Sequence, residues 1–147
     1  MIKKQFSTAA MGLEFSLLVS RTNAELSRRL DRRLGALHGI SFVDFTVMNE
    51  LSADPSSRMR RVDLADKLGL TQSAVTRILL PLEKIGLVSR HPDPNDARVG
   101  YAALTKTGRV LLEEARETAE TVCGDLLSGI TDEEFEGAKA AFRRIVR

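Results

Sequence analysis

The chain has 147 residues, with 22 Lys and Arg against 20 Asp and Glu for a net charge of +2, and one cysteine. A folded chain of this size buries roughly two-thirds of the surface of its unfolded state, so one domain can fold without disulfides. The single cysteine excludes an internal disulfide framework and indicates a reducing compartment, and no apolar run approaches the ~20 residues of a membrane span. Glu14 interrupts the modest apolar run near the N-terminus, so we expect a cytoplasmic chain without a signal peptide.

The charges are segregated along the chain. Residues 1–54 carry 7 basic and 6 acidic groups, residues 55–110 carry 10 and 5, and residues 111–147 carry 5 and 9. A basic middle third indicates a segment that faces phosphates, whereas the acidic last third need not touch nucleic acid. Chance segregation of a handful of charges is the alternative for this pattern taken alone.

The first part of the chain predicts two helices. Leucines spaced mainly at three, four or eight positions give residues 8–37 an apolar face, and Gly35 and Gly39 mark the end of that helix. Ser41 then looks like an N-cap, with Asp44 three residues further on, and it opens a shorter helix before a loop at residues 54–57.

Residues 62–108 predict a helix-turn-helix followed by a wing. Leu64, Ala65 and Leu68 give a short helix its buried side, and Gly69 suits the C-cap, where a positive φ is needed. Thr71 caps the next helix, whose expected buried stripe consists of Val75, Ile78, Leu79, Leu82 and Ile85.

Four polar residues are left to point outward from the N-terminal half of that second helix, namely Gln72, Ser73, Thr76 and Arg77. Short hydrogen-bonding groups and a guanidinium are the types that read base edges in a major groove, and the free N–H groups of the first turn favour phosphate. An ordinary solvated helix face is the alternative, and the wing that follows favours DNA reading.

Two strands, at residues 87–90 and 99–104, are predicted around a polar hairpin stiffened by prolines. Arg98 lies just after the hairpin tip and Asp96 is near enough to orient it, which suits a probe of a narrow minor groove. A surface ion pair worth under ~1 kcal/mol is the alternative for these two residues. Further cations that are candidates for phosphate contacts are Arg58, Arg60, Arg90 and Lys106.

Two more amphipathic helices are predicted after the wing, one at about residues 107–128 and one opened by a capping box of Thr131 and Glu134. Together with the first helix, they carry more apolar surface than one winged helix can cover. The surplus predicts a homodimer built from the terminal helices. A monomer whose terminal helices pack back on their own module is the alternative.

The run GLVSRHPDPNDARVGYAALTKTG resembles the wing signature of the MarR family of bacterial and archaeal transcription regulators. Its parts are a Gly-Leu-Val-x-Arg strand ending at Arg90, the D-x-R wing tip of Asp96 and Arg98, and a Leu-Thr-x-x-Gly helix start ending at Gly108. The preceding run DLADKLGLTQSAVTRILLPLEKIGLV is similar to the helix-turn-helix of that family. The resemblance covers essentially the whole chain, since terminal dimerisation helices are also the family's plan.

The resemblance implies a homodimeric regulator that binds pseudo-palindromic operators, usually as a repressor. Many such proteins are released by small phenolic or other aromatic effectors, which commonly lodge between the dimerisation helices and the DNA-binding module. The lining that the resemblance implies here consists of His38, Phe42, Phe45 and Met48, side chains that would serve equally well in the core.

Metal, cofactor and catalytic sites are not indicated by the sequence. His38, His91 and Cys123 lie too far apart along the chain to form a ligand cluster. No Ser/His/Asp set, paired carboxylate motif or Gly-rich phosphate loop stands out. Cys123 falls on the apolar side of its helix, where a buried thiol is usually inert, and this argues against redox sensing.

We therefore expect a mainly α fold with a small β-wing, as a single MarR-like domain over residues 1–147. A winged helix-turn-helix DNA-binding lobe is expected at about 41–106, and dimerisation helices at about 8–37 and 107–147. The expected partners are a double-stranded DNA operator, a second copy of the chain and a small-molecule effector, without a membrane or a cofactor. The rivals from other classes are a winged helix used only for protein contact and a small enzyme acting on an aromatic substrate.

Overall fold

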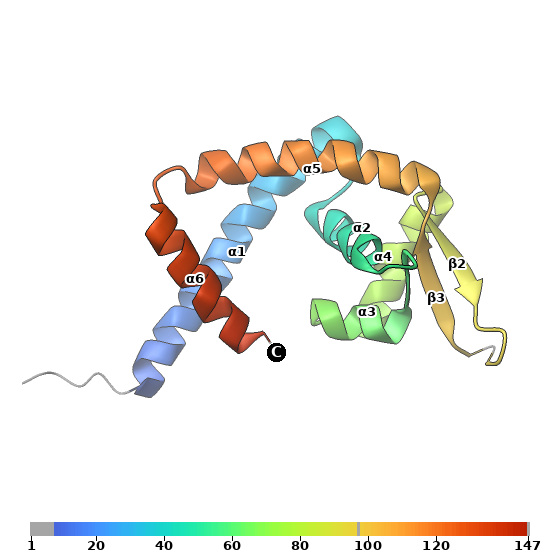
Figure 1. Cartoon of the computed structure of the whole chain (residues 1–147), viewed down its shortest axis with the longest axis horizontal. Helices are drawn as coiled ribbons and strands as arrows, with labels where there is room; N and C mark the ends of the chain where they lie inside the picture. The colour runs from blue at the N-terminus through green and yellow to red at the C-terminus, as the bar shows by residue number, and fades with distance from the viewer. Residues whose placement is uncertain (1–7, 97, 147) are drawn as a thin grey trace, which may run out of the picture.

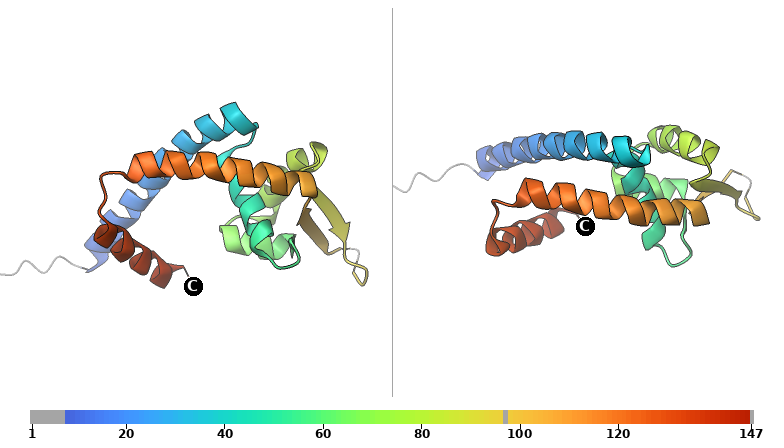
Figure 2. Two further views of the ribbon diagram at one scale, coloured as in Figure 1. Left: turned by 45° about the horizontal axis from the view of Figure 1, so that its top comes forward. Right: turned by 90° about the horizontal axis from the view of Figure 1, so that it is seen from above.

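The computed structural model describes residues 8–96 and 98–146, and these are mainly helical with one small antiparallel sheet (Figure 1). The elements in chain order are α1 (Thr8–His38), α2 (Phe42–Ala53), β1 (Arg58–Arg60), α3 (Arg61–Leu68), α4 (Gln72–Lys84), β2 (Val88–Pro92), β3 (Gly100–Leu104), α5 (Lys106–Leu127) and α6 (Asp132–Ile145). One lobe gathers α2, α3, α4 and the sheet, while α5 runs from this lobe to α1 and α6 at the other end (Figure 2). The expected architecture, a winged helix-turn-helix with terminal helices, is confirmed.

Three of the predicted helix starts have the expected side-chain caps. Ser41 and Asp44 form a reciprocal capping box at the start of α2, and Thr131 and Glu134 form another at the start of α6. The hydroxyl of Thr71 accepts a hydrogen bond from the backbone N–H three residues further on and so caps α4. A cap of this kind stabilises a helix by about 1 kcal/mol, because it satisfies a donor that the helix leaves free.

The sheet has one strand more than the two that the sequence predicts. Its order is β1-β3-β2, with Arg58 opposite Ala103 and Arg60 opposite Tyr101. The two predicted wing strands are present as β2 and β3, and the sequence missed β1, which has only three residues and points only Met59 into the core. Such a strand has no alternating pattern long enough to be recognised before its partner is known.

The core lies where α2, α3, α4 and the sheet meet the C-terminal half of α1 and the first half of α5. Its largest fully buried side chains are Leu30, Leu34, Val47, Met48, Leu51, Leu64, Val75, Leu79, Leu82, Val88 and Leu112. Three residues of the predicted stripe of α4, Val75, Leu79 and Leu82, are buried, and Ile78 is half-buried. Ile85 was wrongly included, since α4 ends at Lys84 and the Ile85 side chain is 60% exposed.

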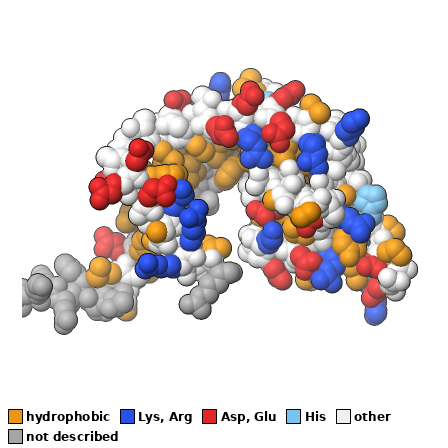
Figure 3. All heavy atoms as spheres, in the orientation of Figure 1, with side chains coloured by type: hydrophobic (Ala, Val, Ile, Leu, Met, Phe, Trp, Pro, Cys, Tyr) orange, Lys and Arg blue, Asp and Glu red, His pale blue; other side chains and the backbone are white. Residues whose placement is uncertain are grey.

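The end of the molecule formed by the N-terminal half of α1 and by α6 leaves more apolar side chains exposed than the lobe does. The N-terminal half of α1 exposes a series of apolar side chains, which are Met11, Leu13, Phe15, Leu17 and Leu18. No residue of α6 is buried, and one of its contacts with α1 joins the rings of Phe15 and Phe142, 5.8 Å apart. Apolar side chains gather under α5 at this end of the molecule. They lie beside the open space between this end and the lobe (Figure 3). Over the described ranges, no helix has the length and apolarity that crossing a bilayer needs.

Candidate nucleic-acid interface

The turn between α3 and α4 sets the direction in which α4 begins. Gly69 closes α3 in the left-handed conformation, with φ 63°, and its N–H bonds back to the carbonyls of Ala65 and Asp66. A residue with a Cβ is strained at that φ, so glycine is favoured there. The chain then reaches Thr71, and α4 starts at the surface of the lobe with its first turn uncovered.

The predicted reading residues lie on the outward side of α4. Gln72, Ser73 and Arg77 are exposed and Thr76 is half-buried, whereas Val75 is completely buried between them. The first two turns of α4 therefore present an amide, two hydroxyls and a guanidinium on one surface. These groups can donate to and accept from base edges.

The tip of the wing is organised by aspartates. Oδ1 of Asp93 accepts hydrogen bonds from the backbone N–H groups of Asn95 and Asp96, which closes the turn. Oδ1 of Asp96 accepts from the backbone N–H of Arg98 at 3.0 Å and from its Nε–H at 3.2 Å. These two bonds, the backbone one first, lower the pKa of Asp96 below its usual range. The residue between Asp96 and Arg98 lies outside the described residues.

Arg98 is consequently oriented without being buried. Its side chain is 91% exposed, although the guanidinium is bonded to Asp96. A surface pair of this kind contributes little to folding stability, because water screens both charges. The arrangement leaves the guanidinium free to project from the hairpin, as the sequence predicts for a minor-groove probe.

One shallow depression brings the wing and the recognition helix together. It has a volume of about 240 Å³, and its lining residues are Arg60, Arg61, Val62, Gln72, Arg98, Val99 and Gly100. Three arginines from β1, α3 and the wing thus meet the first residue of α4. Each arginine is bonded to one carboxylate, Arg60 to Asp63, Arg61 to Glu83 and Arg98 to Asp96.

Sequence reasoning did not single out Arg61 in this cluster. In the run Arg58–Arg61, three cations surround one methionine, and the pattern does not distinguish the inward-facing arginine from the others. Only the start of α3 directly after β1 turns Arg61 toward the interior, where its side chain is 15% exposed. A three-residue strand followed at once by a helix start would have been the signal.

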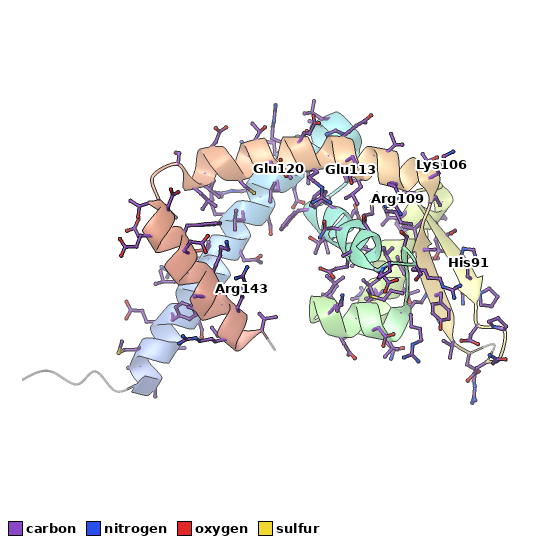
Figure 4. All side chains as sticks on the ribbon, in the orientation of Figure 1. His91, Lys106, Arg109, Glu113, Glu120 and Arg143 are labelled. Carbon is purple, nitrogen blue, oxygen red and sulfur yellow. The ribbon has the colours of Figure 1, made fainter. Side chains whose placement is uncertain are left out.

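The other predicted phosphate contacts are spread around the lobe. The guanidinium of Arg58 lies over the ring of Tyr101, 5.0 Å from its centroid, on the outer face of the sheet. Arg90 is exposed on β2, opposite Ala102. Lys106 begins α5 at the end of β3 away from the wing tip, so it does not join the depression (Figure 4). Of the four predicted cations, the structure brings only Arg60 beside Gln72 and Arg98.

The four residues predicted to line an effector site do not form one pocket. Met48 is completely buried in the core, and Phe45 packs against that core with its ring 6.4 Å from that of Phe42. Nε2 of His38 lies 2.8 Å from the hydroxyl oxygen of Thr118, a hydrogen bond that joins α1 to α5. The assignment of these residues to an effector remains a prediction.

Phe42 does line a cavity of its own, of about 460 Å³. This cavity lies between α1, α2 and the helix-turn-helix, and its lining residues are Asn23, Ser27, Asp31, Ser41, Phe42, Val43, Thr46, Leu68 and Leu70. Oδ1 of Asp31 accepts a hydrogen bond from the backbone N–H of Phe42 at 2.7 Å, which ties α1 to the start of α2. An open cavity with an aromatic wall and several hydroxyl and amide groups suits a small organic ligand.

Cys123 behaves as a structural thiol. It is half-buried on α5 and packs against the core, and burial raises the pKa of the thiol. Less of it is therefore in the reactive thiolate form near neutral pH. No group of three or more His, Cys, Asp or Glu side chains in the described part of the chain could hold a metal ion.

The geometry of the lobe agrees with a match to a known protein family. Residues 40–99, which contain the helix-turn-helix and reach the wing, match the family described as the MarR family. YdgJ, an uncharacterized HTH-type transcriptional regulator of Bacillus subtilis, is 36% identical over 72 residues. That match spans 49% of this chain and 44% of YdgJ, which is less than half of the relative's length.

Solved structures extend the likeness to the terminal helices. The transcriptional regulator BldR from Sulfolobus solfataricus is 28% identical with a TM-score of 0.82, over 95% of this chain and 99% of that chain. Sco3205, a MarR family transcriptional regulator from Streptomyces coelicolor solved in complex with DNA, is 25% identical with a TM-score of 0.80, over 99% and 91%. The family match falls on the helix-turn-helix, and the fold shared with BldR and Sco3205 extends over nearly the whole chain, so this protein is similar to MarR family transcriptional regulators in its helix-turn-helix segment and in its overall fold.

Proposed function

We propose that this protein is a cytoplasmic repressor that binds a pseudo-palindromic operator as a homodimer. The observation that carries the proposal is the depression in which Gln72 at the start of α4 and Arg98 of the wing lie together beside Arg60. A helix that enters the major groove and a hairpin that reaches the neighbouring minor groove must act from one surface. The DNA-bound crystal form of Sco3205 supports the same choice of partner.

Within this proposal, base reading belongs to the first turns of α4. Gln72, Ser73, Thr76 and Arg77 enter the major groove, where an amide can pair with adenine and a guanidinium with guanine. Arg98 enters the minor groove, with Asp96 holding its orientation. Backbone phosphates are met by cations at the edge of the surface, namely Arg58, Arg60, Arg90 and Lys106.

The homodimer is supported by the apolar surface that a single chain leaves uncovered. The N-terminal half of α1 and all of α6 expose large side chains, such as Leu13, Leu17, Phe142 and Ile145, at 42–63%. Contiguous exposure of this kind is unusual for a soluble monomer and marks an interaction surface. A two-fold dimer formed there would place two reading surfaces on DNA, with half-sites about one helical turn, roughly 10 base pairs, apart.

Release by a small aromatic or phenolic effector is the second part of the proposal. The 460 Å³ cavity touches α1 on one side and Leu68 and Leu70 of the helix-turn-helix on the other. A ligand that fits one relative position of these elements better than another shifts the lobe toward that position. Phe42 supplies a ring for stacking, and Asn23, Ser27 and Thr46 supply polar groups for a phenolic hydroxyl.

The test is fluorescence anisotropy of the purified protein with duplex DNA from the region upstream of its own gene, against a scrambled duplex, over a salt series. Binding that prefers the upstream duplex and weakens steeply with salt is expected, because several phosphates are neutralised. A flat salt response on both duplexes would overturn DNA as the main partner. Adding simple phenols to the preformed complex then tests release, and unchanged anisotropy with all of them would remove the phenolic class.

A further inference from the structure

A largely covered ion pair lies behind the depression that joins the wing to the recognition helix. Nη2 of Arg61, the first residue of α3, donates to Oε1 of Glu83 near the end of α4, at 2.9 Å. The two side chains are 15% and 19% exposed, which makes this the most enclosed ion pair in the described part of the chain. It therefore connects two helices through side chains that are mostly shielded from solvent.

The same guanidinium supports the base of the wing. A Cβ built on Gly100, the first residue of β3, would lie 3.4 Å from Nε and 3.5 Å from Cδ of Arg61. The side chain of Arg61 thus passes directly against the backbone where the hairpin leaves the sheet. It shares the lining of the depression with Gln72 and Arg98, so one residue touches the surroundings of both reading elements.

Stability does not explain why an arginine occupies this position. Among the described residues, the buried Nε–H of Arg61 finds no hydrogen-bond acceptor. Burying two charges carries a desolvation cost, and an unpaired buried donor adds to it. Apolar residues of similar volume often replace such a pair without loss of stability, whereas a directional pair restricts how the elements can pack.

We propose that Arg61 and Glu83 are positioning residues that hold the base of the wing in a fixed place relative to α4, so that Arg98 and the reading residues engage DNA together. The inference rests on the proposed DNA-binding function. It assigns to the pair an effect on the wing in particular, because Arg61 meets β3 at Gly100, whereas Arg77 is not among the residues that line the depression.

A double-mutant cycle tests the proposal with the tightest-binding duplex selected from random-sequence DNA. Arg98→Ala is introduced into the native protein and into the Arg61→Met, Glu83→Leu double variant. We expect Arg98→Ala to weaken binding about tenfold in the native background and no more than about twofold in the double variant. Arg77→Ala is the matched control, and its cost is expected to be the same in both backgrounds. An equal cost of Arg98→Ala in both would overturn the positioning role.

Amide hydrogen exchange in the DNA-free protein tests, independently of DNA binding, whether Arg61 and Glu83 hold the base of the wing in place. We expect the β3 amides to exchange at least about fivefold faster in the double variant, while the α4 amides on the Arg77 side keep their native rates. Unchanged β3 exchange would overturn the proposal. If the native protein bound no duplex, the DNA-binding proposal would fail, and the exchange rates would still test the link between Arg61 and the wing.

A second variant covers the case in which the apolar pair disturbs folding. Arg61→Lys keeps a cation opposite Glu83 but removes the planar group that lies against Gly100. Faster β3 exchange with an unchanged melting temperature is expected for this variant. Native exchange at β3 would count against the proposed contact between Arg61 and the wing.

Discussion

Gly108 in the first turn of α5 lies directly against the backbone carbonyl of Leu87, the residue just before β2. A Cβ built on Gly108 would overlap the Leu87 oxygen and would lie 2.9 Å from Cδ1 of Leu104. The same carbonyl accepts a hydrogen bond from the N–H of Thr105 at 3.1 Å, and the Thr105 hydroxyl donates to the carbonyl of Gly86 at 2.7 Å. The Leu-Thr-x-x-Gly segment is therefore the joint between the wing and the long helix.

Gly108→Ala is expected to destabilise the protein by about 1–3 kcal/mol, because the methyl group meets backbone atoms that have no room to move. Guanidinium denaturation at one fixed protein concentration measures the change. Gly124→Ala in the same helix is the matched control. A Cβ there meets nothing within 4 Å, and the substitution is expected to stabilise the protein by about 0.5–1 kcal/mol. Equal stability of the two variants would contradict the role of Gly108.

Arg98→Ala is expected to weaken operator binding by about 1–3 kcal/mol without changing the oligomeric state. The reason is that the guanidinium projects from the hairpin and holds the fold together only through a surface pair with Asp96. Anisotropy titrations at moderate salt measure the affinity, and size-exclusion chromatography checks the assembly. Arg32→Ala, an exposed arginine of α1, is the control and should bind as the native protein does. Unchanged affinity of Arg98→Ala would remove the wing from DNA recognition.

The contact between Asp96 and Arg98 is expected to persist in mildly acidic solution. Because the pKa of Asp96 is lowered in the folded protein, the stabilisation is complete above the ordinary aspartate value, about 3.9, and is lost only as the pH falls through the lowered value. The affinity ratio between the native protein and Arg98→Ala should therefore be constant from about pH 8 to about pH 5.5. A ratio that falls steadily over that interval would show that another titrating group controls the wing.

Cys123 is expected to react slowly with thiol reagents. Burial raises its pKa, so the thiolate fraction at pH 7 is smaller than that of a free cysteine, and the rate should climb as the pH rises toward the raised value. The time course with a chromogenic disulfide measures this, with the guanidinium-unfolded protein as the reference. A folded-state rate equal to the unfolded one at pH 7 would contradict the burial argument.

Phe142→Glu is expected to shift the protein from dimer to monomer and to lower its operator affinity. Phe142 is part of the apolar surface of α6 that Phe15 partly covers within the chain, and a carboxylate there would have to be desolvated in the proposed dimer. Sedimentation velocity measures the assembly. Ile85→Glu replaces a similarly exposed apolar residue at the end of α4 and should remain dimeric. A dimeric Phe142→Glu would place the interface elsewhere.

The elements that the sequence predicts well are those encoded by neighbouring residues. The caps at Ser41, Thr71 and Thr131 and the left-handed turn at Gly69 depend on groups within four positions, and all four are as expected. The Asp96–Arg98 contact belongs to the same class, since donor and acceptor lie two positions apart. Local chemistry of this kind is visible in a sequence because the chain cannot carry the partners far apart.

The features that the sequence did not predict depend on distant partners. β1 exists because β3, some forty residues later, supplies its hydrogen bonds. The burial of Arg61 depends on Glu83 from another helix, and the cavity beside Phe42 depends on how α1 meets the helix-turn-helix. The wrong inclusion of Ile85 has the same origin, since a helical period does not reveal the residue at which the helix ends.

α5 connects the lobe to the end of the molecule formed by α1 and α6. Its first turn packs against Leu87, just before β2, through Gly108, and further along it packs against α1 before α6 turns back. In the proposed dimer the length of this helix determines the distance between the two DNA-reading surfaces. One inserted residue would turn the lobe by about 100° and move it by ~1.5 Å along the helix axis. In that dimer the length of α5 would set the half-site spacing of the proposed operator, and changes in that length would be tolerated only near whole helical turns.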